Sequence, residues 1–246
     1  MSKRKHMGTT KTTMGTVGKI FILHGWTYTH KPWNFLVQAL REAGFKAELL
    51  PIPGLTAETD HTWTMDDYVA WLDKHVAKEK KVILIGHSNG GRIALALAAR
   101  YPEKIQQLIL IDSAGLAEKR LSIKIKRSLF STAAHIGKKI TKSENMRRLL
   151  YTLARAQDYR QASPHMRETM KNLLAVDLTP ELHNITAPTL ILWGANDTVT
   201  PVADAHILHD SITGSTLSII PGAKHSPHIT HPEIIKQKIL TTLKYL

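Results

Sequence analysis

A serine that could act as a nucleophile lies in the run G-H-S-N-G at residues 86–90. The short apolar run at residues 82–85 predicts a buried strand before it, and the Ala- and Leu-rich residues 92–100 predict a helix after it. A strand, a sharp turn and a helix are the setting in which a G-x-S-x-G pattern exposes its serine hydroxyl at the tip of the turn, and the flanking glycines remove side chains that would collide there. The stretch therefore predicts that Ser88 is a nucleophile. The alternative is a glycine-rich turn with an incidental serine.

A serine hydroxyl needs a base that takes its proton, and the base needs a partner that fixes its tautomer. His225 follows the last expected strand and is the predicted base, the alternative being a loop histidine without a catalytic role. Asp197 follows the preceding strand and is the predicted acid, although it could simply cap the next helix. Asp112 also ends an expected strand and competes with Asp197 for the same role.

Strands and helices are expected to alternate along most of the chain. The expected strands are residues 19–23, 45–50, 82–85, 107–111, 189–193 and 216–220, and the expected helices are residues 32–43, 65–76, 92–100, 202–211 and 231–246. The strands are apolar throughout rather than on alternate residues, which is typical of a parallel sheet with helices on both faces. In such α/β folds the reactive site lies beyond the carboxyl ends of the strands. His24, Ser88, Asp112 and Asp197 all come just after such ends.

Four motifs resemble those of the α/β-hydrolase family. They are H-G-W at residues 24–26, the turn at residues 86–90, G-A-N-D at residues 194–197, and G-A-K-H at residues 222–225 followed by Pro232. The order serine, acid, histidine is also the order of that family. The resemblance spans residues 19–246 and implies a carboxylesterase-like serine hydrolase without a cofactor. The family usually has two further strands before the His-Gly turn, and the polar first 18 residues look too short to supply both.

The oxyanion hole that this resemblance implies consists of two main-chain N–H groups, those of Asn89 and Trp26. The Trp26 indole could line the acyl pocket or serve only for packing. His24 and His87 are expected to hold the loops around the site rather than to react. His225 also begins an evenly spaced trio with His228 and His231, but the intervening prolines disfavour one continuous helix, so no metal site is expected.

A narrower resemblance concerns the H-G-W turn and residues 223–232. Both are similar to the biotin-pathway esterases that cleave the methyl ester of pimeloyl-acyl carrier protein. Several reactions remain open: cleavage of a small carboxylic ester, of an ester linked to acyl carrier protein, of a thioester, or of a carbon–carbon bond by the same triad. A binding protein that retains the fold is a further alternative.

Composition narrows the class of protein. The chain has 246 residues, 43% of them hydrophobic, which suits one large α/β domain. There is no cysteine, which excludes disulfides and thiolate chemistry, and no nucleotide-binding glycine pattern follows any strand. No apolar run approaches the roughly 18 residues of a membrane span, and residues 1–18 lack the apolar centre of a secretory signal. Those residues are expected to form a flexible tail, and a cytoplasmic location is expected.

Residues 114–180 show helical spacing only and are predicted to form a cap inserted into a core of residues 19–113 and 181–246. Basic residues heavily outnumber acidic ones there, so most of the net charge of +13 falls on the cap. The simplest explanation is a lid whose charged side chains face solvent. The alternatives are attraction of an anionic substrate or acyl carrier protein, or docking on an anionic membrane surface. Nucleic acid is disfavoured because no aromatic stacking platform is interleaved with the charges. The sequence does not predict the oligomeric state.

Overall fold

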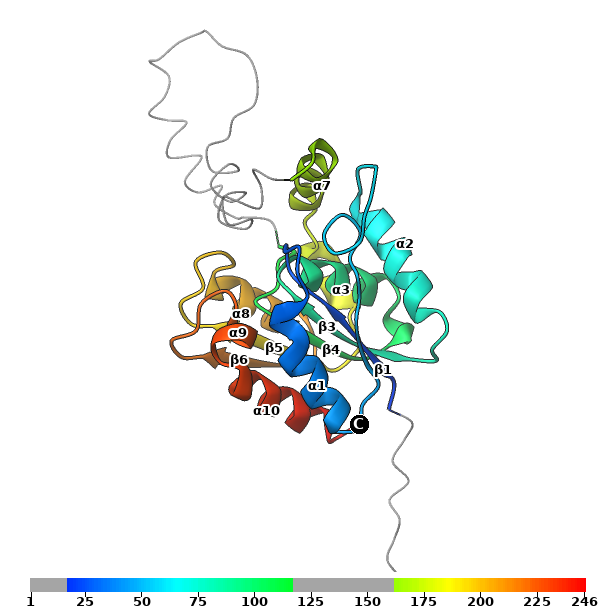
Figure 1. The fold of residues 1–246 in the computed structure, drawn as a ribbon. Helices are drawn as coiled ribbons and strands as arrows, with labels where there is room; N and C mark the ends of the chain where they lie inside the picture. The colour runs from blue at the N-terminus through cyan, green and yellow to red at the C-terminus, as the bar shows by residue number, and fades with distance from the viewer. Residues whose placement is uncertain (1–16, 117–161) are drawn as a thin grey trace, which may run out of the picture.

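The computed structural model describes residues 17–116 and 162–246, and within them six strands form one sheet (Figure 1). Every neighbouring pair is parallel, and the strand order is β2-β1-β3-β4-β5-β6. The strands are β1 (Lys19–Leu23), β2 (Ala47–Leu49), β3 (Val82–His87), β4 (Ile105–Ile111), β5 (Thr189–Gly194) and β6 (Ser215–Ile220). This confirms the predicted α/β fold with a mostly parallel sheet.

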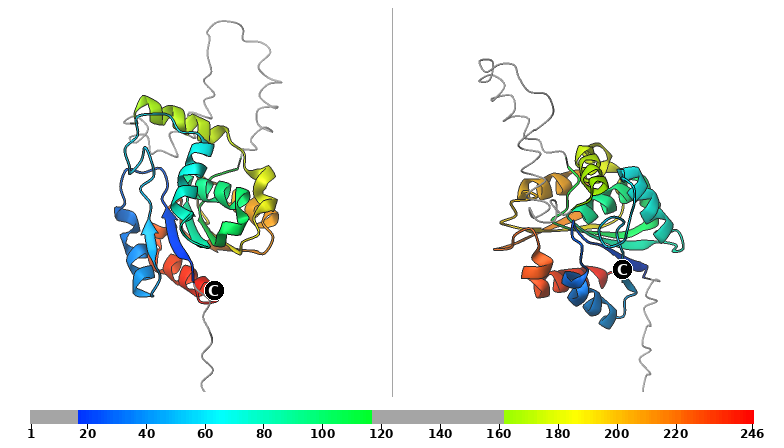
Figure 2. Two further views of the ribbon diagram at one scale, coloured as in Figure 1. Left: turned by 90° about the vertical axis from the view of Figure 1, so that its right-hand side faces the viewer. Right: turned by 45° about the horizontal axis from the view of Figure 1, so that its top comes forward.

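Helices cover both faces of the sheet, as Figure 2 shows. The α-helices are α1 (Asn34–Glu42), α2 (Met65–Val76), α3 (Asn89–Arg100), α7 (Pro164–Ala175), α8 (Val202–Ser211), α9 (Pro227–Thr230) and α10 (Pro232–Leu243). Short 3₁₀ helices are η1 (Lys31–Trp33), η2 (Pro102–Lys104) and η3 (Thr179–Asn184). One core lies between the sheet and α2, α3 and α8, and the other between the sheet and α1 and α10. The central strands alternate between these two cores, and this is why they are apolar at every position.

The edge strands are shorter or more exposed than expected. The expected strand at residues 45–50 is reduced to three residues, Ala47–Leu49, which pair only with β1. At the other edge, most of β6 is partly exposed, in agreement with its serine and threonine side chains.

Both α2 and α8 have the predicted limits. At the start of α2, Thr64 accepts from the Asp67 N–H while the Asp67 carboxylate accepts from the Thr64 N–H, and this capping box sets the first turn.

The register of the sheet brings the candidate residues together at one edge. Leu23 pairs with Gly86, His87 with Ile111, and Ile111 with Leu192. The residues that follow β1, β3, β4 and β5 therefore all emerge at the carboxyl edge, where parallel sheets carry their sites.

Most of the predicted cap, residues 117–161, and residues 1–16 of the predicted tail lie outside the described residues. The predicted division into tail, core and cap therefore remains a prediction. From the predicted cap region, the structure describes α7, which lies beyond the carboxyl edge of the sheet (Figures 1 and 2). None of the described helices is long and apolar enough to cross a membrane.

Candidate active site

Ser88 occupies the sharp turn between β3 and α3 with φ of 51° and ψ of −118°, a conformation that residues with a side chain rarely adopt. The turn is crowded by main chain. A Cβ on Gly86 would lie 2.6 Å from the Gly91 Cα, and one on Gly90 would lie 2.3 Å from the carbonyl oxygen of Leu23. Only glycine fits at these two positions, as predicted. Because the turn leads directly into the helix, α3 begins at Asn89 rather than at residue 92.

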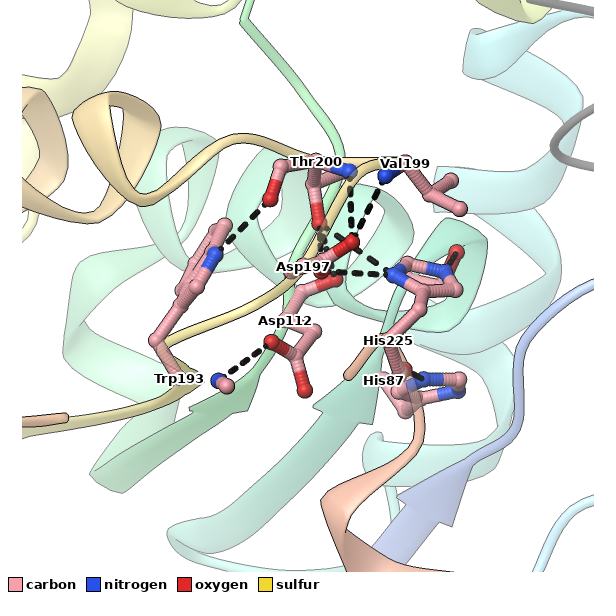
Figure 3. A network of polar contacts seen from close by, with 9 residues as sticks. His87, Asp112, Trp193, Asp197, Val199, Thr200 and His225 are labelled. Carbon is pink, nitrogen blue, oxygen red and sulfur yellow. Dashed lines mark hydrogen bonds and ion pairs between the residues drawn. The ribbon is translucent and has the colours of Figure 1, made fainter. Parts of the chain in front are cut away.

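The structure brings Ser88, His225 and Asp197 together from three separate loops. His225 Nε2 lies 2.9 Å from Ser88 Oγ, and His225 Nδ1 lies 2.8 Å from Asp197 Oδ2. Figure 3 shows the imidazole directed at the Asp197 carboxylate. With a hydrogen on Nδ1 donated to Asp197, Nε2 is free to accept the serine proton. The arrangement can therefore support nucleophilic chemistry by a serine hydroxyl.

The Asp197 side chain is fully buried and is saturated with hydrogen bonds. Its Oδ1 accepts from the Val199 N–H at 2.7 Å and the Thr200 N–H at 3.1 Å, and its Oδ2 lies 2.7 Å from Thr200 Oγ1. Burial alone would raise the pKa of this carboxyl, but the hydrogen bond and charge attraction of His225, together with the Thr200 and Val199 bonds, lower the pKa below its usual value. Asp197 is thus held as the charged partner of His225. Val199 and Thr200 were missed from sequence, although an Asp that accepts from the following N–H groups is a common turn pattern.

Asp112, the competing candidate acid, is placed beside Asp197 and makes no hydrogen bond to His225. It is fully buried, its Oδ1 accepts from the Gly194 N–H at 2.8 Å, and its Oδ2 has no hydrogen-bond partner among residues 17–116 and 162–246. Burial first, and then the neighbouring Asp197 carboxylate, raise the pKa of Asp112 to about 9. His225 therefore contacts Asp197 rather than Asp112. The roles of His225 as base and of Asp197 as acid remain predictions.

The two main-chain N–H groups expected to form the oxyanion hole belong to Trp26 and Asn89, which line one pocket with Ser88. Neither N–H donates a hydrogen bond to another residue of the described part of the chain. Two free donors beside the serine are what a developing oxyanion requires. Their assignment as an oxyanion hole remains a prediction. Trp26 lines the pocket and also packs against the hydrophobic core, so both of its expected roles stay open.

Two histidines hold the surrounding loops, as expected. His24 Nδ1 donates to the Gly25 carbonyl at 2.8 Å, and its Nε2 accepts from the Thr56 hydroxyl at 2.7 Å. His87 Nε2 donates to the carbonyl oxygen of His225 at 2.7 Å. Burial lowers the pKa of His24 to about 4 and that of His87 well below its ordinary value. Both rings are therefore neutral at pH 7 and keep these contacts.

The remaining members of the histidine trio point to different surroundings. His228 is buried and stacks on Trp33 with ring centroids 4.4 Å apart, whereas His231 Nδ1 lies 2.8 Å from Thr230 Oγ1. Pro227 and Pro232 begin two separate helices, which confirms that no continuous helix carries the three. Among the residues described, no group of three or more His, Cys, Asp or Glu is arranged to hold a metal ion.

Arg92 is a buried residue of the site that sequence reasoning missed. It lines the pocket with Ser88, and its Nη1 donates to the carbonyl oxygens of Leu173 at 2.5 Å and Val176 at 3.1 Å, at the end of α7. Burial lowers its pKa to about 10, partly offset by Asp177, so the guanidinium stays charged at pH 7. Arg92 thus fastens α7 to α3, and α7 supplies the apolar wall of the pocket. The residues of this wall are Met170, Leu173 and Leu174.

Comparison with known proteins places the chain in a family. A family model described as the alpha/beta hydrolase fold matches residues 19–232. The chain is 24% identical to the pimeloyl-[acyl-carrier protein] methyl ester esterase of Nitrosomonas europaea over 90% of this chain and 94% of that protein. It is 27% identical to the esterase of the same name from Aeromonas hydrophila subsp. hydrophila, over 87% and 91%.

Among solved structures, the fold is similar to that of MGS-MChE2, an α/β hydrolase enzyme from the metagenome of sediments of the Mar Chica lagoon, Morocco. The TM-score is 0.69 at 23% identity, covering 94% of this chain and 92% of that one. These similarities agree with the prediction of a hydrolase-type enzyme. The chain belongs to the α/β-hydrolase fold family.

Proposed function

We propose that the protein is a serine hydrolase that cleaves a carboxylic ester through an acyl-enzyme intermediate. The observation that carries the proposal is the unbroken series of contacts from Ser88 Oγ through the His225 imidazole to the Asp197 carboxylate, at 2.9 and 2.8 Å. Both distances are within the range needed for proton transfer and for fixing the tautomer of the base.

In this mechanism His225 Nε2 accepts the hydroxyl proton as Ser88 Oγ attacks the carbonyl carbon of the ester. The imidazolium that forms is stabilised by the charged Asp197, whose low pKa keeps it ionised. The main-chain N–H groups of Trp26 and Asn89 hold the oxyanion of the tetrahedral intermediate. The alcohol then leaves with the proton from His225. A water molecule, activated by the same base, subsequently hydrolyses the acyl-serine.

As the substrate class we propose an ester of an acyl chain carried on acyl carrier protein. Two observations support this choice. The relatives described above are named for such an ester and match nearly the whole chain. Lys and Arg also greatly outnumber Asp and Glu in the predicted cap region, residues 114–180, which would attract an acidic carrier. The alternative on the same triad is a small free ester, a thioester or a carbon–carbon bond.

The proposal is tested with wild type, Ser88→Ala and the matched control Ser211→Ala, which lies at the end of α8. A short p-nitrophenyl ester should be hydrolysed by wild type and Ser211→Ala, and Ser88→Ala should lose about 10³-fold or more of kcat. Turnover by Ser88→Ala at the wild-type rate would refute the triad.

The substrate class is tested separately with a methyl ester on acyl carrier protein and the same acyl methyl ester without the carrier. Preference for the carrier-bound ester, declining as salt rises, supports attraction of the carrier by the basic residues of the predicted cap region. Equal kcat/KM for the two substrates would refute the proposed carrier, without affecting the ester mechanism.

A further inference from the structure

Asp112 contacts the loop between β5 and α8 at two points. Its Oδ1 accepts from the Gly194 N–H at 2.8 Å, where the loop begins, and its main-chain oxygen lies 3.2 Å from Thr200 Oγ1, where the loop ends. Asp197 lies between these two points. Figure 3 shows Asp197 between Asp112 and Thr200. Asp112 is therefore placed to fix the loop that presents Asp197 to His225.

The two carboxyl groups are buried next to each other, and their environments differ. Asp197 accepts from two main-chain N–H groups and interacts with Thr200 and His225. In contrast, Asp112 Oδ1 accepts one hydrogen bond, and its Oδ2 has none from the residues that the structure describes. Two adjacent buried carboxylates repel each other strongly, so one of them stays protonated. Asp197, which has more hydrogen bonds, takes the charge, and the proton remains on Asp112.

No cation offsets a charge on Asp112 in the part of the chain described. It forms no ion pair there, and the charged group that acts on it is Asp197 on the loop after β5. Figure 3 also draws His225, on the loop after β6, and His87, at the end of β3, on the same side of the network. His87 is held neutral by burial and His225 is paired with Asp197. Ionisation of Asp112 would therefore add an uncompensated negative charge beside the triad.

The backbone of Asp112 has a φ of 42°, which is strained for a residue with a side chain. Aspartate and asparagine tolerate this region better than other residues with a Cβ, and glycine adopts it without strain. These preferences supply two substitutions that keep the backbone conformation: asparagine changes only the carboxyl group, and glycine removes the side chain.

We propose that Asp112 is a positioning residue of the triad, which works as a neutral carboxylic acid: it fixes the loop that carries Asp197 and leaves Asp197 as the one charged carboxylate. The inference rests on the proposed ester hydrolysis. Since Asp112 acts through Asp197 and not on the substrate, its alteration should change kcat and the pH profile far more than KM.

The experiment compares wild type with Asp112→Asn and Asp112→Gly from pH 5 to 10.5. Three quantities are measured: kcat and KM for a p-nitrophenyl ester, and the rate at which a fluorophosphonate labels Ser88. Wild type should lose activity above about pH 9, where burial and Asp197 place the pKa of Asp112. Asp112→Asn, always neutral, should keep most of the activity at pH 7 and show no such loss near pH 9. Asp112→Gly should lose about tenfold or more in kcat at pH 7, because the Gly194 N–H loses its acceptor.

An alkaline limb in Asp112→Asn equal to that of wild type would overturn the inference. A kcat of Asp112→Gly equal to that of wild type would also overturn it. So would a wild-type activity that stays constant up to pH 10, a result that can be obtained without any variant. Failure of the proposed function looks different, because wild-type Ser88 would then neither be labelled nor support ester turnover.

Discussion

His87 Nε2 donates to the main-chain oxygen of His225 at 2.7 Å, so the strand that ends at the nucleophile also holds the loop that carries the base. The two rings lie 5.1 Å apart. His87 directly precedes Ser88 and is hydrogen-bonded to His225, so small movements of the turn and of the His225 loop are coupled. This coupling keeps the distance from Ser88 Oγ to His225 Nε2 short.

Replacing His87 with Phe should fill the space and leave the His225 carbonyl without its donor. An unpaired buried carbonyl costs about 1–3 kcal/mol, and the same loosening should lower kcat by about tenfold. The measurement is kcat together with the free energy of unfolding in urea. His209→Phe on α8, an exposed histidine that contacts Ser215 and no residue of the site, serves as the control. Unchanged kcat in His87→Phe would show that the contact does not position the base.

Asp197→Asn should lower kcat by about 10³- to 10⁴-fold with little change in KM, because the amide neither stabilises the imidazolium nor selects the right tautomer. The control is Asp210→Asn, near the end of α8. It removes one carboxylate outside the triad and should retain wild-type activity. A loss smaller than tenfold in Asp197→Asn would mean that another group supports His225.

Arg92→Met should remove the donor for the Leu173 and Val176 carbonyls and release the end of α7. Loss of these charged hydrogen bonds is expected to cost about 2–3 kcal/mol of stability. Because α7 lines the pocket, KM should rise more than kcat falls. Arg92→Lys keeps one charge and a donor and should recover part of both. The comparison uses urea unfolding and steady-state kinetics, and identical stability of Arg92→Met and wild type would contradict it.

Asp112 should also make stability depend on pH. Its pKa is raised from 3.8 to about 9 in the folded state. Between these values the folded state binds a proton that the unfolded state has lost, so the free energy of unfolding falls as pH rises, by up to about 1.4 kcal/mol per pH unit. Asp112→Asn removes this contribution. Urea unfolding from pH 5 to 8 should give a flatter dependence for the variant, and equal slopes would show that Asp112 is charged in the folded protein.

Much of the fold could be predicted because the central strands are buried on both faces. An uninterrupted apolar run such as that of β3 has no other explanation at this length, and the helices with strong caps, such as α2, have sharp limits. The edge strands were less predictable, since their exposure depends on which strand has only one neighbour. The strand at residues 45–50 was therefore expected to be longer than β2 is.

The members of the candidate triad could be selected from their order and from their positions after strands. The residues that hold the triad and its pocket in place could not be predicted in this way. Arg92 meets the carbonyl of Leu173 81 residues later, and the Asp112 side chain meets the Gly194 N–H 82 residues later. No local pattern reports such a contact. Asp112 in particular looked like a rival of Asp197, whereas the structure places it as a neighbour with one hydrogen bond and no charge partner in the described part of the chain.

The central claim is tested most directly by treating the folded protein with a fluorophosphonate and locating the adduct by mass spectrometry. The account predicts one adduct, on Ser88, formed by wild type and slowed at least 10³-fold in His225→Ala, because the hydroxyl then has no base. An unlabelled Ser88 in folded wild type, or labelling that is as fast without His225, would contradict it.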